Sequence, residues 1–175
     1  MNAGHNRPRV LRGLLLMGGA MAMAACSNDT MQISDKPLFV LHSSSQCATP
    51  TTEPSATWLN NHAAVADFYA RLDHQQIGLE RRLPAIDFDE AGVLLIEMGR
   101  RTTGGYTLAL AEPSIELDGK TAIITLNWQE PVPGSIVTQA LSSPCLLIQV
   151  PRGEYTMIHL LDQSGKLRLK VATSS

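Results

Sequence analysis

The side chains that are able to do chemistry in this sequence are few, and their spacing fits no common metal site. His62 and His74 are too far apart for the i, i+4 pair of a helical metal site, and the H-E-x-x-H pattern is absent. Asp87, Asp89 and Glu90 lack the D-x-D-x-D-G spacing of a calcium loop, so we interpret them as a solvated turn. The sequence therefore predicts no metal and no cofactor.

The candidate nucleophiles also lack partners. Ser142, Ser143 and Cys145 lie close together around Pro144, but the neighbouring sequence holds no histidine or acid to activate them. His159 stands in an apolar run, which is typical of a packed strand residue rather than a general base. The G-x-S-x-G elbow and the G-x-x-x-x-G-K-[ST] phosphate loop are both missing. We expect that the protein is not an enzyme and has no catalytic residues.

The stretch GRRTTGGYTLAL, from Gly99 to Leu110, carries the densest group of polar side chains before an apolar run. Two adjacent glycines favour a connection through positive φ, so we interpret the stretch as a hairpin turn. Closing a turn does not require two guanidinium groups and two hydroxyls in succession. The stretch therefore also predicts a contact edge for a partner, and the candidate contact residues are Arg100, Arg101, Thr102, Thr103, Gly104, Gly105 and Tyr106.

The N-terminal residues have the pattern of an export signal. Arg7, Arg9 and Arg12 precede a run without charge from Leu14 to Ala25, which predicts a signal peptide over residues 1–25. This run is too short for a membrane-spanning helix, which needs about 20 apolar residues. Its end, MAAC, resembles the lipobox of bacterial lipoproteins, although leucine is usual where Met23 stands.

That resemblance implies that Cys26 is lipidated and becomes the new N-terminus; the alternative is an incidental thiol. Ser27 stands where an aspartate would indicate retention at the inner membrane. The resemblance thus implies a protein of the bacterial cell envelope that is anchored in the outer membrane and faces the periplasm. Residues 26–36 are predicted to form a tether, and residues 37–175 a single domain.

Charge excludes one class of partner. Without residues 1–25 the chain has 150 residues, which suits one domain, and 11 of the 14 basic residues remain against all 16 acidic ones. The net charge is then −5. Nucleic acid is not expected as a partner, because binding it needs a positive patch that displaces counterions from phosphates.

Cys47 and Cys145 are the two cysteines that remain after the predicted anchor. An exported compartment favours oxidation, so we predict a disulfide between them. The alternative is two separate thiols, one of them buried in a strand.

Hydrophobic periodicity predicts the elements that position these residues. A strand at 37–42 and a loop at 43–55 are followed by a helix that begins at Ser55 or Thr57 and ends near Asp73. The apolar period of the helix is 3.6 residues, through Trp58, His62, Val65, Tyr69 and Leu72. Residues 83–88 are an irregular lead-in, because Pro84 disfavours helix in the residue before it.

From Gly92 onward the pattern changes to short apolar or alternating runs separated by turn residues, with a tight hairpin at Asp118-Gly119 and a turn at Ser164-Gly165. We therefore predict an α+β fold, with one N-terminal helix packed on a mainly antiparallel β-sheet or sandwich-like core. The predicted strands are 93–98, 106–111, 115–117, 122–128, 145–150, 155–161 and 167–171.

Four sequence segments together resemble one known family. IDF at 86–88 precedes a strand that ends in MGRRTTGGYTLAL, and EPVPG at 130–134 and TQALSSPCLLIQVPR at 138–152 follow. Thr-Gly-Gly-Tyr, Thr-Gln-Ala and a later proline, in this order, resemble the C-terminal domain of the PrcB family over 86–152. The family is named after a lipoprotein component of a bacterial surface protease complex. Cys145 departs from a frequent aromatic residue, and Thr102 from a frequent proline.

The resemblance implies a non-catalytic accessory domain that binds a protein partner and assembles or stabilises an exported protease or another surface complex. Chagasin-type inhibitors of cysteine proteases also present a Thr-Thr-Gly-Tyr-like loop, which makes a protease inhibitor the alternative. A structural envelope lipoprotein without a discrete ligand is a further interpretation.

Overall fold

The fold is described by a computed structural model, which covers Met1 and residues 32–34, 36–73 and 82–173. The predicted signal peptide, Cys26 and His74 lie outside these described residues. Gln32–Ile33, inside the predicted tether, form a short strand that pairs with Glu116–Leu117.

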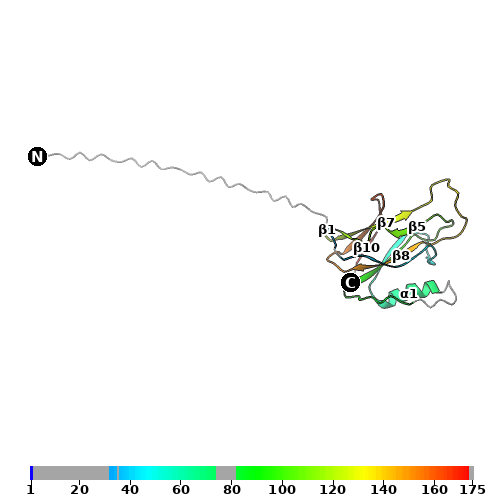
Figure 1. Ribbon diagram of the computed structural model, residues 1–175, viewed down its shortest axis with the longest axis horizontal. Helices are drawn as coiled ribbons and strands as arrows, with labels where there is room; N and C mark the ends of the chain where they lie inside the picture. Colours follow the sequence, from blue (N-terminus) through cyan, green and yellow to red (C-terminus); the bar gives the residue numbers. More distant parts are fainter. Residues whose placement is uncertain (2–31, 35, 74–81, 174–175) are drawn as a thin grey trace.

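The described residues form ten strands and one helix (Figure 1). In chain order these are β1 (Gln32–Ile33), β2 (Phe39–Ser44), β3 (Ser55–Leu59), α1 (His62–Asp73), β4 (Ala91–Glu97), β5 (Thr107–Leu110), β6 (Glu116–Asp118), β7 (Thr121–Gln129), β8 (Cys145–Pro151), β9 (Met157–Asp162) and β10 (Leu167–Ala172).

The strands divide into two sheets. The first sheet has the order β1-β6-β7-β9-β10, with β5 pairing the later part of β7, and the second has the order β2-β8-β4-β3. All pairs are antiparallel except β7 with β9, which are parallel. β7 and β9 are neighbours in the first sheet, but β8, which lies between them in the chain, belongs to the second sheet. No tight turn joins β7 to β9, so the two strands can run parallel.

The fold has three layers, which are the two sheets and the helix. The apolar side chains of β4 show how they pack. Leu94 and Ile96 of β4 belong to the core between the two sheets, whereas Val93 and Leu95 pack with α1 on the outer face of the second sheet. The strand is therefore buried on both faces, as its apolar sequence AGVLLIE requires. In Figure 1 the helix lies along β8 on the side away from β7.

The predicted α+β fold with an N-terminal helix is wrong. The protein is mostly β, with two sheets, and its one described helix has 12 residues and follows three strands. The outer face of the second sheet does pack on this helix, through Val65, Phe68, Tyr69 and Leu72. The helix covers that face, and the main core lies between the sheets.

The helix begins later than predicted because the residues before it pair with β4. Trp58 lies in β3, opposite Leu94, although its spacing from His62 also fits a helix. Asn61 then caps the helix, since its side-chain Oδ1 accepts a hydrogen bond from the backbone N–H of Ala64 at 2.9 Å.

The predicted hairpin at Asp118-Gly119 is confirmed, because Asp118 pairs with Thr121 across a two-residue turn.

No helix within the described residues is long and apolar enough to cross a membrane.

Candidate protein-binding surface

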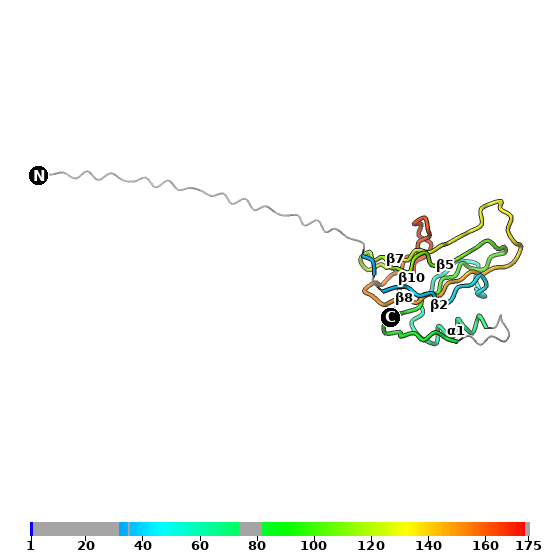
Figure 2. Tube along the Cα trace, in the orientation of Figure 1, coloured from blue at the N-terminus to red at the C-terminus, as the bar shows by residue number. Residues whose placement is uncertain are grey.

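Three connections between strands meet at one end of the two sheets, and we call them together the three-loop surface. They are residues 45–54 between β2 and β3, residues 98–106 between β4 and β5, and residues 130–144 between β7 and β8. The strand register places them together, since the ends of β3 and β4 pair at Ser55 and Glu97, and Glu97 pairs with Cys145. Figure 2 shows the loops gathered at the end of the fold away from β1.

The GRRTTGGYTLAL stretch is not a hairpin turn, which corrects the sequence interpretation. β4 lies in the second sheet and β5 in the first, so loop 98–106 crosses from one sheet to the other. Loop 130–144 crosses in the opposite sense, from β7 to β8. The two crossings run beside one another.

The adjacent glycines allow the two crossing loops to touch. The backbone N–H of Gly104 donates to the carbonyl oxygen of Thr138 at 2.9 Å. A Cβ on Gly104 would lie 2.2 Å from Thr138 Oγ1, and a Cβ on Gly105 would lie 3.0 Å from Val137 Cγ1. Gly105 also has φ +86°, a conformation that side chains with a Cβ rarely adopt. The glycines thus serve both close approach and backbone geometry.

Arg101 is part of the scaffold of this surface. Its backbone exchanges two hydrogen bonds with Ser142, of 2.7 and 3.0 Å, and its guanidinium group donates to the carbonyl oxygen of Met98. The guanidinium also lies 5.2 Å from the centre of the Tyr106 ring, which is a cation–π distance. Ser142 Oγ donates to the carbonyl oxygen of Thr103 at 2.8 Å.

The seven predicted contact residues therefore lie together but present different groups to solvent. Arg100 and Thr102 are exposed, whereas Arg101, Thr103 and Tyr106 are half-buried and interact with the loops themselves. Sequence alone does not separate Arg100 from Arg101, because the difference depends on Ser142, a residue distant in the chain. Arg100 and Thr102 are the side chains of this loop that are accessible to a partner.

Loop 130–144 supplies exposed apolar side chains. Val132, Ile136 and Leu141 have exposed fractions of 73%, 103% and 64%. After Glu130 at the start of the loop, the sequence has no charged residue up to Pro151, so no charge lies among these apolar residues. Figure 2 shows the loop extending well away from the sheets. Exposed apolar groups of this kind favour contact with another macromolecule.

The start of this loop is held by an ionic network. Glu130 accepts a hydrogen bond from Trp128 Nε1 at 2.8 Å and pairs with Arg168 at 3.3 Å. Arg168 in turn donates to Asp162 at 2.7 Å, and Asp162 is 2% exposed. Hydrogen bonds from the Ser164 hydroxyl first, then from the backbone N–H of Ser164, from Arg168 and from the backbone N–H of Lys166, hold the Asp162 pKa well below its usual value, although burial opposes this shift.

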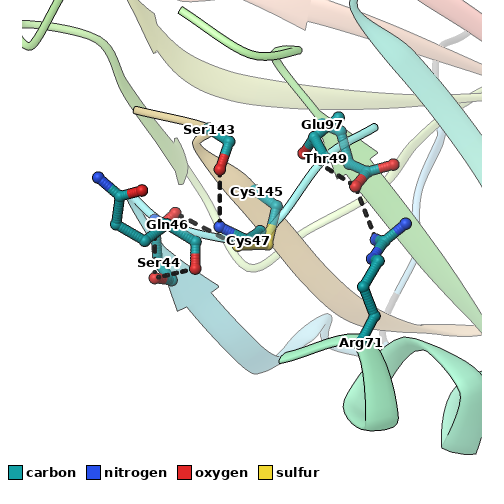
Figure 3. The surroundings of a disulfide bond; sticks show 8 residues. All are labelled: Ser44, Gln46, Cys47, Thr49, Arg71, Glu97, Ser143 and Cys145. Carbon is teal, nitrogen blue, oxygen red and sulfur yellow. Dashed lines mark hydrogen bonds and ion pairs between the residues drawn. A yellow bond between two sulfur atoms is a disulfide. The ribbon is translucent and has the colours of Figure 1, made fainter. Parts of the chain in front are cut away.

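The Cys47–Cys145 disulfide joins loop 45–54 to the first residue of β8, directly after loop 130–144, which confirms the predicted pairing. The two Cα atoms are 5.9 Å apart. Cys47 N–H donates to Ser143 Oγ at 2.9 Å, and Gln46 Nε2 donates to the carbonyl oxygen of Leu141 at 2.7 Å. Figure 3 shows the contact of Cys47 with Ser143 beside the disulfide. Sequence reasoning did not assign loop 45–54 to the surface, although the predicted disulfide was a signal for it.

Glu97, at the end of β4, connects loop 45–54 to the helix α1. Its carboxylate accepts from Thr49 Oγ1 at 3.1 Å and from Arg71 Nη2 at 2.7 Å, as Figure 3 shows. Glu97 is 6% exposed, and Arg71 comes from α1. The loop, the second sheet and the helix are thus connected through one buried carboxylate.

The other residues considered for chemistry have structural contacts. Asp87 Oδ1 accepts from the backbone N–H of Asp89 at 2.9 Å, which closes a turn before β4. His159 is half-buried in β9, and it pairs with Lys170 and with Ile123 on either side.

Two further features on other elements concern ionisable groups. Burial raises the pKa of Tyr155 to about 12, although Arg152 opposes this shift, and its hydroxyl donates to Pro151. His42, Cys47 and Cys145 form a group whose ligand atoms lie within 4.8 Å of one another, but the sulfurs are joined in the disulfide. Oxidised cysteines offer no thiolate to a metal.

A comparison with protein families matches this part of the fold. Residues 93–151 match the family model described as PrcB C-terminal. This segment is similar to that family, and we call it the PrcB C-terminal region. The resemblance inferred from the sequence motifs is thereby confirmed. No curated protein and no solved structure matches the chain.

The PrcB C-terminal region spans β4 to β8 and therefore contains two of the three loops, 98–106 and 130–144. The family's Thr-Gly-Gly-Tyr and Thr-Gln-Ala segments meet in space at the contact of Gly104 with Thr138. Loop 45–54 lies outside the matched residues.

Proposed function

We propose that the protein is a non-catalytic accessory protein that binds a partner protein through the three-loop surface and so assembles or stabilises an exported protease or another surface complex. The observation that carries the proposal is that loops 98–106 and 130–144 of the PrcB C-terminal region meet in space, and that loop 130–144 exposes Val132 and Ile136. Glycine-dependent packing and the disulfide hold these loops, so a partner meets a preformed surface.

The anchor belongs to the same proposal. Acylation of Cys26 in the MAAC sequence places the domain at the outer membrane, on the periplasmic side. That compartment is oxidising, which favours the Cys47–Cys145 disulfide. Metabolic labelling with an alkyne-modified palmitate tests the anchor. We expect labelling and membrane retention of the wild type and loss of both in Cys26→Ser. An unlabelled wild type in a bacterial host that processes lipoproteins would remove this part of the proposal.

Partner binding is tested by affinity purification of the tagged protein from detergent-solubilised envelopes after crosslinking in cells. We expect a protein partner that is recovered with the wild type and much reduced with Ile136→Ser. The matched control is Ile33→Ser, because Ile33 is also highly exposed, at 71%, but lies in β1 at another place on the fold. Equal recovery with both variants would contradict binding through the three-loop surface.

A protease inhibitor is the second candidate, and one observation favours it. The Thr-Thr-Gly-Gly-Tyr loop and loop 130–144 lie side by side at one end of a two-sheet fold, as a wedge for a protease cleft requires. Purified protein assayed against a panel of papain-like and serine proteases separates the two functions. Inhibition at micromolar concentration that is lost in Thr102→Ala would favour the inhibitor, and unaffected proteases would remove it.

A further inference from the structure

The three-loop surface contains a pocket of about 330 Å³ that none of the sequence motifs predicts. It lies between loop 45–54 and loop 130–144, with Gln46, Ala48 and Thr49 on one side and Leu141 and Ser142 on the other. Arg100, Pro50 and Ser143 complete the lining. The pocket thus joins loop 45–54, which lies outside the PrcB C-terminal region, to the two loops inside it.

Arg100 gives this pocket a positive charge that is not neutralised. It is the one charged residue among the described lining residues, it is exposed, and no ion pair joins it to the described part of the chain. The nearest acid in the sequence, Glu97, is buried and bound to Arg71 and Thr49. An unneutralised guanidinium at a protein surface is a site for a carboxylate, which it binds through two parallel hydrogen bonds.

Two other described pockets lack this property. One is lined by Lys36 and Glu90, which pair with each other at 3.3 Å. The other is lined by both Arg152 and Glu154, so its charges are balanced. Only the pocket at Arg100, among these three, combines a cation with no lining acid.

The polar side chains in the walls already have partners within the protein. Gln46 Nε2 donates to the carbonyl oxygen of Leu141, Ser142 Oγ donates to Thr103, and Thr49 Oγ1 donates to Glu97. The Arg100 guanidinium is the charged donor that this lining offers to a ligand. Leu141, 64% exposed, adds an apolar wall beside it.

The wall opposite Leu141 has a fixed shape. Ala48 has φ +53° and is the one non-glycine residue with positive φ in the described chain. Such a conformation persists only where the surroundings impose it, and it is concentrated at ligand-binding and active sites. Here the disulfide at Cys47 and the buried Thr49–Glu97 hydrogen bond flank Ala48 and hold it. The pocket is thus preorganised for a ligand.

We propose that this pocket binds a carboxylate of a partner polypeptide, with an adjacent aliphatic side chain of the partner packed on Leu141. The carboxylate is that of a chain terminus or of an aspartate or glutamate side chain, and Arg100 binds it. The inference deepens the proposed function and rests on it, since it gives the chemistry by which the partner is recognised at the three-loop surface.

The test is a nitrogen-15 NMR titration of the purified full-length protein in detergent with three small probes. N-acetyl-leucine carries a terminal carboxylate, the α-amide of N-acetyl-glutamate carries a side-chain carboxylate, and N-acetyl-leucinamide carries none. We expect saturable shifts of the Arg100 Nε–H and of the Ala48 and Leu141 backbone amides with at least one carboxylate probe, and none with the amide. The probe that binds more tightly identifies the source of the carboxylate.

Variants then assign the binding to Arg100. Arg100→Ala should weaken binding by about tenfold or more, and Arg100→Lys should retain part of it because a charge remains. The matched control is Lys120→Ala, which removes an exposed cation from the turn at the opposite end of β7. Equal shifts with the amide probe, no saturable shift with either carboxylate, or unchanged binding in Arg100→Ala would each overturn the proposal.

The outcomes also separate this inference from the proposed function. If Arg100→Ala loses the carboxylate probes but still recovers a partner from envelopes, the complex depends on the apolar residues of loop 130–144, and the pocket is not its recognition site. If the probes bind through Arg100 while no partner is recovered, the pocket stands and the accessory function fails.

Discussion

Gly104 and Gly105 show how two neighbouring residues of one type meet different physical demands. Gly104 is required by the approach of Thr138, whose Oγ1 occupies the space of a Cβ. Gly105 is required by its own backbone, with φ +86°. The sequence predicts positive φ for a Gly-Gly pair, but the close approach of Thr138, 34 positions later in the chain, is invisible to it.

Because the two glycines are required for different reasons, Thr138→Ala should restore stability to a variant at position 104 but not to one at position 105. Gly104→Ala should lower the free energy of unfolding by about 1–3 kcal/mol, because the added methyl group overlaps Thr138 Oγ1. The Gly104→Ala/Thr138→Ala pair should regain most of that loss, whereas Gly105→Ala, costing about 1–2 kcal/mol, should not be rescued by Thr138→Ala. Urea unfolding of the variants measures this double-mutant cycle. Additive losses at positions 104 and 138 would contradict the packing of the two loops.

At the scale of elements, the sequence predicts β2 and the later strands well but misses β1 and β3. The runs that became β4, β7 and β8 are strongly apolar or alternating, and each lies within a residue or two of its prediction. Residues 55–59 were assigned to a helix because Trp58 and His62 share a helical spacing, but pairing with β4 determines their structure. Such pairing is a nonlocal effect that outweighs local periodicity.

Asp162, at the end of β9, should make the stability of the protein depend on pH. The lowered pKa of Asp162 means that its ionised form stabilises the folded state above its unfolded pKa of about 4, and that this contribution is lost as the pH falls toward the folded pKa. Unfolding free energies measured from pH 6 downward should therefore drop for the wild type below about pH 4.

Asp162→Asn should be less stable at pH 6 and should show a flatter pH profile. Asp118→Asn, at the exposed end of β6, is the matched control and should follow the wild type. Since Arg168 links Asp162 to Glu130, acidification should also increase amide hydrogen exchange at the start of loop 130–144. A parallel decline of the wild type and Asp162→Asn would contradict the role of this carboxylate.

At the scale of the whole molecule, the division of the strands between two sheets creates the three-loop surface. Periodicity identifies strands but not the sheet to which each belongs, so the sequence predicted a hairpin where loop 98–106 crosses between sheets. The family motifs in loops 98–106 and 130–144 did identify residues that meet in space. Loop 45–54 carries no such motif, and the disulfide holds it to the start of β8, directly after loop 130–144.

That bond should matter for stability as well as for the surface. The Cys47–Cys145 disulfide joins residues 98 positions apart, and losing a bridge of that kind typically costs about 2–5 kcal/mol. Cys47→Ala/Cys145→Ala should unfold at a lower urea concentration than the oxidised wild type and should coincide with the wild type in reducing agent. An unchanged midpoint in the double variant would show that the disulfide does not hold the fold together.

The central claim is that a partner protein binds the three-loop surface, and photo-crosslinking from single positions in living cells tests it most directly. A photoreactive phenylalanine analogue at Thr102 or Ile136 should give a crosslinked band with a partner, because both side chains are exposed there. The same analogue at Lys120, exposed at the opposite end of β7, should give none. Crosslinks from Lys120 but not from positions 102 and 136 would contradict the account.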